Sequence, residues 1–104
     1  MARREKFEAR EVRRLFSNGS LLVRVLVLGL MQGDVSLADA GTIISAIEDS
    51  RSRNEQYQGL ILAETCWPRF SVPDKQDIHA VIRKADIDRE SDRWRLAQRV
   101  LALT

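Results

Sequence analysis

Residues Leu21–Met31 read LLVRVLVLGLM, an apolar run whose only charged side chain is Arg24. By residue propensity, a run this rich in Val and Leu could form a buried β-strand. We predict a helix from Leu21 to about Gln32, because the chain offers no second strand-like segment to pair with it. A helix that is apolar on all sides belongs at the centre of a domain. The run is also too short for a membrane span, which needs about 20 residues.

Two later segments repeat this pattern of a polar cap followed by helical spacing, Asn54–Ala63 and Arg93–Leu103. Aligning Val25, Tyr57 and Trp94 brings Leu28, Leu60 and Ala97 into register. The two steps, 57 − 25 and 94 − 57, are 32 and 37 residues. Such spacings are typical of repeats built from helical pairs.

Shorter amphipathic segments lie before and between these three. We predict a first helix from about Arg4 to Phe16, with Ala9, Val12, Leu15 and Phe16 on its apolar side and Asn18-Gly19 after its end. Helical spacing of apolar residues predicts four further helices. The third has Leu37, Ala40, Ile43, Ile44 and Ile47 on its apolar side, and the fourth, which Pro68 ends, has Tyr57, Leu60, Ile61 and Trp67. The fifth has Ile78, Val81, Ile82 and Ala85, and the sixth has Trp94, Ala97, Val100 and Leu101.

Polar residues mark where these helices begin. The predicted caps are Ser20, the capping boxes Ser36-x-x-Asp39, Ser52-x-x-Glu55 and Ser71-x-x-Asp74, and either Asp88 or Ser91 for the last helix.

The sequence therefore predicts an all-α fold of about six antiparallel helices joined by short connections. Two architectures suit this count: stacked helical hairpins, which the repeat favours, and a closed six-helix bundle of the death-domain kind. The run Leu21–Met31, with its arginine near the start, and the stretch Asp92–Leu101 resemble inner helices of the HEAT and armadillo repeats. That resemblance implies scaffolding or partner binding and brings no catalytic residues with it.

Length and composition predict one domain, residues 1–104, with 44% apolar and 31% charged residues. Because the amphipathic pattern continues to Leu103, we expect this domain to be part of a longer protein. A single cysteine, Cys66, excludes an intramolecular disulfide and indicates a cytoplasmic protein.

The first helix carries the strongest surface signal. On an ideal helix five cations of this segment fall on one side, opposite the apolar residues: Arg3, Lys6, Arg10, Arg13 and Arg14. Such a stripe could bind an acidic protein, phosphates or anionic lipid headgroups. A solvated outer face, partly neutralised by nearby glutamates, is the alternative interpretation.

Two tryptophans are candidates for partner contacts. Trp94 keeps the phase of the core and is predicted to lie inside, whereas Trp67, beside Pro68 at a helix end, is the candidate exposed anchor, with core packing as its alternative. Arg93, Arg95 and Arg99 could form a second basic patch unless they pair with the acids between Asp86 and Asp92.

The remaining candidates favour structural roles. The acidic series from Asp86 to Asp92 lacks the glycine and the distal glutamate of a calcium loop. His79 is predicted to be a boundary residue and Cys66 a small buried hydrophobe.

We therefore expect no enzyme activity, cofactor or metal, and we predict a protein–protein interaction or scaffolding module. A self-associating adaptor of the death-fold kind is the second hypothesis. Binding of nucleic acid or another anionic surface through the first-helix cations is the third.

Overall fold

The computed structural model describes residues 14, 16 and 20–104 of the chain. In these residues the fold is all-helical, without strands, as the sequence predicts. The α-helices are α2 (Leu21–Gly33), α3 (Ala40–Glu48), α4 (Arg53–Cys66), α5 (Val72–Lys84) and α6 (Asp92–Leu101), and two 3-10 turns are η2 (Val35–Leu37) and η3 (Trp67–Arg69). The predicted first helix lies outside the described residues except for Arg14 and Phe16.

Serine caps determine where four of these helices begin. Each serine hydroxyl accepts a hydrogen bond from the backbone N–H three residues later. The pairs are Ser20 with Val23 (3.4 Å), Ser52 with Glu55 (3.0 Å), Ser71 with Asp74 (3.3 Å) and Ser91 with Trp94 (3.2 Å). The helical state of residues 21–31 and the choice of Ser91 over Asp88 as a cap are thereby settled.

The capping box predicted at Ser36 is wrong. Asp34 accepts hydrogen bonds from the backbone and hydroxyl of Ser36, which holds that residue in the turn η2. Helix α3 begins three residues later than predicted, with Asp39 as its cap. The Asp39 carboxylate accepts from both the N–H (3.1 Å) and the hydroxyl (2.7 Å) of Thr42. A carboxylate satisfies two donors at once here, so the aspartate replaces the serine as the start signal.

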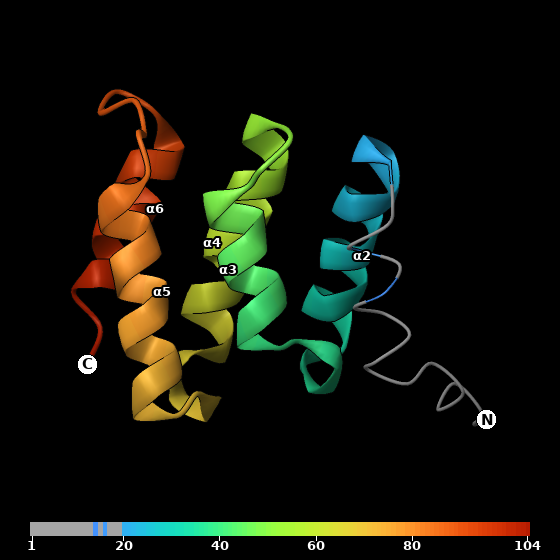
Figure 1. Cartoon of the computed structure of the whole chain (residues 1–104), viewed down its shortest axis with the longest axis horizontal. Coiled ribbons are helices and arrows are strands. Elements are labelled where there is room, and N and C mark those ends of the chain that lie inside the picture. Colours follow the sequence, from blue (N-terminus) through green and yellow to red (C-terminus); the bar gives the residue numbers. More distant parts are fainter. Residues whose placement is uncertain (1–13, 15, 17–19) are drawn as a thin grey trace.

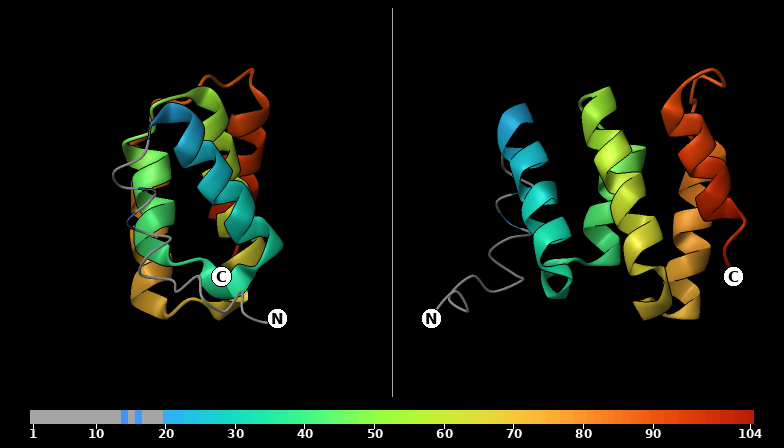
Figure 2. Two further views of the ribbon diagram at one scale, coloured as in Figure 1. Left: turned by 90° about the vertical axis from the view of Figure 1, so that its right-hand side faces the viewer. Right: turned by 180° about the vertical axis from the view of Figure 1, so that it is seen from behind.

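The helices lie in two layers. Helices α3 and α5 pack against each other in one layer, and α4 packs between α2 and α6 in the other. The side view in Figure 2 shows these two layers edge-on, and in Figure 1 the chain advances along the long axis from α2 to α6. None of the described helices has the length and apolar character needed to cross a membrane.

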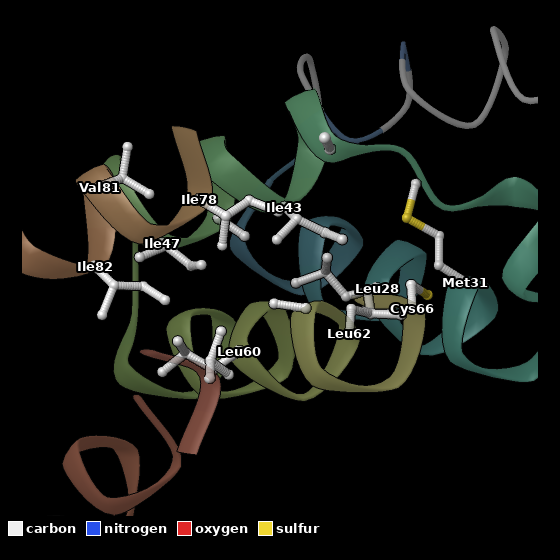
Figure 3. Close-up of a cluster of buried hydrophobic side chains, with 14 of the residues drawn as sticks. Leu28, Met31, Ile43, Ile47, Leu60, Leu62, Cys66, Ile78, Val81 and Ile82 are labelled. Carbon is white, nitrogen blue, oxygen red and sulfur yellow. The ribbon is translucent and has the colours of Figure 1, made fainter. Parts of the chain in front are cut away.

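The hydrophobic core runs between the layers along the whole molecule. Every described helix contributes a fully buried side chain: Leu28, Ile43, Leu60, Ile78 and Val100. Figure 3 shows the aliphatic side chains of α3, α4 and α5 filling the space between these helices. The predicted core residues Tyr57, Ile61, Ala85 and Leu101 are only partly buried, because two layers cover each helix on limited sides.

Helices α3 and α4 approach each other closely at Gly59. A Cβ atom built on Gly59 would lie 2.8 Å from the Cβ of Ala46. Only a residue without a side chain fits this crossing, so Gly59 determines how near the two layers can come.

Candidate protein-interaction surface

Arg24, the one charge of the apolar run, is turned into the core. Its Nε donates to Glu55 Oε1 (2.9 Å) and its Nη2 to Glu55 Oε2 (2.7 Å), a two-point contact with the first turn of α4. The side chains of Arg24 and Glu55 are 3% and 0% exposed. Its Nη1 donates to the carbonyl of Phe16 (3.3 Å), whose ring lies 4.0 Å from the guanidinium carbon. The hydrogen bonds that Arg24 donates to the Glu55 carboxylate raise the pKa of Arg24 above its ordinary value.

Glu55 forms only half of the predicted capping box. Its backbone N–H donates to Ser52, but its carboxylate accepts from the N–H of Arg51 (3.3 Å), not from that of Ser52. The carboxylate is drawn inward because Arg24 needs a charged acceptor in the core.

Burial of Arg24 leaves the solvent side of α2 without any charge. Leu26, Gly29, Leu30 and Gly33 are exposed and share one side of the helix, and we call them the α2 face. Leu26 is 62% and Leu30 39% exposed. A Cβ built on either glycine meets nothing within 4 Å, so another backbone could approach closely there. Exposed apolar surface without charge is characteristic of the centre of protein interfaces.

Amide side chains connect the α2 face to α4. Gln32 donates to the side chain of Gln58, and Gln58 donates to Asn54 Oδ1 (3.3 Å). Tyr57 and Ile61 are partly buried on the same helix. The surface of the layer α2–α4–α6 therefore changes from apolar at α2 to neutral and polar at α4.

Three arginines of α6 lie at the other end of this layer, and each of them has a hydrogen-bonding partner. Arg95 pairs with Asp92 (2.9 Å). Arg99 forms a two-point contact with Glu64 of α4 (2.9 and 3.1 Å), which holds the pKa of that carboxyl below its usual value. Arg93 donates to the neutral side chain of Gln56. Pairing with the acids between Asp86 and Asp92 is therefore found for Arg95 only, among the described residues.

Among the described residues, hollows lie where α6 meets α4 and where α6 meets α5. One, of about 440 Å³, lies between the first turns of α4 and α6 and is lined by Arg53, Asn54, Tyr57, Ser91, Asp92 and Arg93. The other, of about 350 Å³, lies between the end of α5 and α6, with Ile87, Trp94 and Leu101 among its lining residues and Arg83 and Arg89 at its edge.

The structure decides between the two interpretations of Trp67 and corrects the predicted position of Trp94. Trp67, the candidate exposed anchor, is 4% exposed and belongs to the core, with its ring stacked on His79 (4.8 Å) and edge-on to Phe70 (6.3 Å). Trp94, predicted inside, is only partly buried and lines a hollow. The turn η3 after α4 folds Trp67 back over α5, which sequence spacing does not reveal.

His79 and Cys66 have structural surroundings. His79 is partly buried and its Nε2 lies 2.9 Å from the carbonyl of Val100, which ties α5 to α6. Cys66 is buried, and burial raises the pKa of its thiol, as expected for a small core residue. The described residues contain no cluster of His, Cys, Asp and Glu suited to a metal ion.

Of the cations predicted to bind a partner, Arg14 is exposed, whereas Arg3, Lys6, Arg10 and Arg13 lie outside the described residues. Sequence reasoning missed Leu26 and Leu30. A signal was available, because a two-layer arrangement of short helices cannot cover all sides of an entirely apolar helix.

The chain was compared with protein-family models, curated proteins and solved structures. No protein-family model, no curated protein and no solved structure matches the chain.

Proposed function

We propose that this chain is a non-catalytic protein–protein interaction module built from stacked helical hairpins, similar in kind to HEAT and armadillo repeats. The two-layer order of α2–α6 supports the stacking, as does the shortest dimension of the molecule, 18 Å. That thickness suits two helices of about 10 Å each.

The observation that carries the function is the α2 face. In a chain with 31% charged residues, an exposed helix surface without any charge is unusual. Exposing a large leucine to water costs free energy that a partner surface would recover, at about 25 cal/mol per Å² of apolar area buried. The third exposed large hydrophobic residue among those described, Val72, is alone at the start of α5 and provides a natural control.

The test is affinity capture from an extract of the source cells with the full chain as bait. Leu26→Glu/Leu30→Glu should lose a defined set of proteins that the unmodified chain and Val72→Glu both retain. All three sites are exposed, so circular dichroism should show the same helicity in each protein. If the leucine variant captures the same proteins in the same amounts as the unmodified chain, the α2 face is not the binding surface and the proposal fails.

A second copy of the chain is the second candidate partner, because an uncharged apolar face is complementary to itself. Analytical ultracentrifugation decides between the two. A dimer of the unmodified chain that Leu26→Glu/Leu30→Glu converts to a monomer would support the self-associating adaptor.

A further inference from the structure

The hollow between the first turns of α4 and α6 brings two arginines together from segments 40 residues apart in sequence. Arg53 is at the first position of α4, and Arg93 is at the second position of α6. Both line the same opening of about 440 Å³. The contact between α4 and α6 is what brings these two cations to one opening.

Neither arginine is neutralised by an acid. Arg93 donates to the uncharged oxygen of the Gln56 side chain, which fixes the guanidinium in place without compensating its charge. Arg53 is exposed and has no hydrogen-bonding or ionic partner among the described residues. The one acid at the opening, Asp92, is engaged with Arg95 (2.9 Å). The hollow therefore concentrates positive charge.

Two neutral donors complete the lining. Asn54 uses its Oδ1 as an acceptor for Gln58, which leaves its amide NH₂ as a donor. Tyr57 also lines the opening, and its hydroxyl donates to none of the described protein groups. Guanidinium groups bind carboxylates through two parallel hydrogen bonds, and amide and hydroxyl donors add to such contacts.

We infer that this hollow binds the carboxylate side chains of an acidic peptide segment in the protein partner. The inference rests on the proposed function, because it names the chemistry of one part of the partner. Two separate guanidinium groups suit two singly charged carboxylates. The Tyr57 ring offers the peptide an apolar contact beside the charges.

The test measures binding of a fluorescein-labelled hexaglutamate peptide to the full chain by fluorescence anisotropy at low salt, where such contacts are least screened. Arg53→Gln/Arg93→Gln should weaken binding at least about tenfold, as expected for loss of roughly 1.4 kcal/mol or more. The matched control is Arg69→Gln/Lys84→Gln, which removes the same charge from exposed positions outside both hollows. It should change the affinity by less than about twofold, since distant exposed charges are largely screened.

A second measurement locates the peptide independently of the variants. In proton–nitrogen correlation spectra of the unmodified chain, the largest shifts on adding hexaglutamate should fall on residues 53–57 and 91–93. Equal weakening by both double variants, or shifts spread over the surface, would overturn the inference in favour of a general charge effect. Tighter binding of inorganic phosphate than of hexaglutamate at the same residues would overturn the assignment to a peptide. Absence of binding would also overturn it, while the capture experiment on Leu26 and Leu30 would still decide the proposed function.

Discussion

Helix α4 is joined to the two helices beside it in its layer, α2 and α6, by one arginine–glutamate pair each, and the two pairs lie in opposite environments. Arg24 of α2 and Glu55 of α4 meet in the core, with side chains 3% and 0% exposed. Arg99 of α6 and Glu64 of α4 meet at the surface, with side chains 61% and 35% exposed. Both pairs are two-point contacts of similar length, 2.7 and 2.9 Å for the buried one and 2.9 and 3.1 Å for the exposed one.

Identical chemistry therefore has different consequences at the two junctions. A buried pair costs free energy to desolvate, and removing one partner leaves the other as an uncompensated charge in the core. An exposed pair contributes little, since water and salt compete for both ions. The α2–α4 junction should thus depend on its ion pair to specify how the helices meet, whereas the α4–α6 junction should depend on its apolar contacts.

The largest effect should come from breaking the buried pair. Glu55→Ala leaves the Arg24 guanidinium in the core without its acceptor, and we expect a loss of roughly 3–5 kcal/mol in the free energy of unfolding. Urea titration followed by circular dichroism measures this. Arg24→Met/Glu55→Met, which replaces both ions by apolar side chains, should regain most of the lost stability. If Glu55→Ala alone costs less than about 1 kcal/mol, water reaches the pair, and the contrast between the junctions disappears.

The second-largest effect on stability should distinguish the buried side of α2 from its exposed side. Leu28 is 0% and Leu26 62% exposed on the same helix. Leu28→Ala should cost roughly 2–5 kcal/mol, because it removes buried contacts and leaves a cavity between α2 and α4. Leu26→Ala should stay within about 0.5 kcal/mol, because its side chain is already in water. Comparable losses from both changes in the same urea titration would mean that the α2 face is covered and is not free for a partner.

The smallest effect belongs to the exposed pair. The hydrogen bond from Arg99 lowers the pKa of Glu64 in the folded state. The folded protein thus holds this proton less tightly than the unfolded chain, so the pair stabilises above the unfolded pKa of about 4.3 and this contribution is lost as the pH falls through the lowered value. The stability difference between the unmodified protein and Glu64→Gln should be small at pH 7 and vanish in acid.

Thermal melts between pH 2 and 7 test this, with Glu90→Gln as the control, because Glu90 is exposed and forms no ion pair with any residue that the structure describes. Adding 1 M NaCl at pH 7 should also reduce the effect of Glu64→Gln, because the Debye length falls to about 3 Å. The effect of Glu55→Ala should persist in the same salt. An effect of Glu64→Gln that is independent of pH and salt would assign Glu64 a packing role instead of an ionic one.

The amino-acid sequence by itself determined the helices and most of their beginnings. Ser20, Ser52, Ser71 and Ser91 act on the backbone N–H three residues away, an interaction complete within one helical turn. The exception was the start of α3, where two aspartates compete with Ser36 for nearby donors. Local chemistry of this kind can be read from neighbouring residues.

Only the tertiary structure decided which sides of the helices face water. Residues 21–31 are apolar all round, so their spacing cannot indicate the side on which α4 packs or that Leu26 and Leu30 remain exposed. Arg24 and Glu55 lie 31 residues apart, so no local sequence signal indicates that they pair. Trp67 reaches the core through a turn that interrupts the helical periodicity of α4. Arg53 and Arg93 likewise share a hollow only because α4 packs on α6. The physical reason is the same each time: burial and pairing depend on which surfaces meet, and those contacts join residues that are distant in the chain.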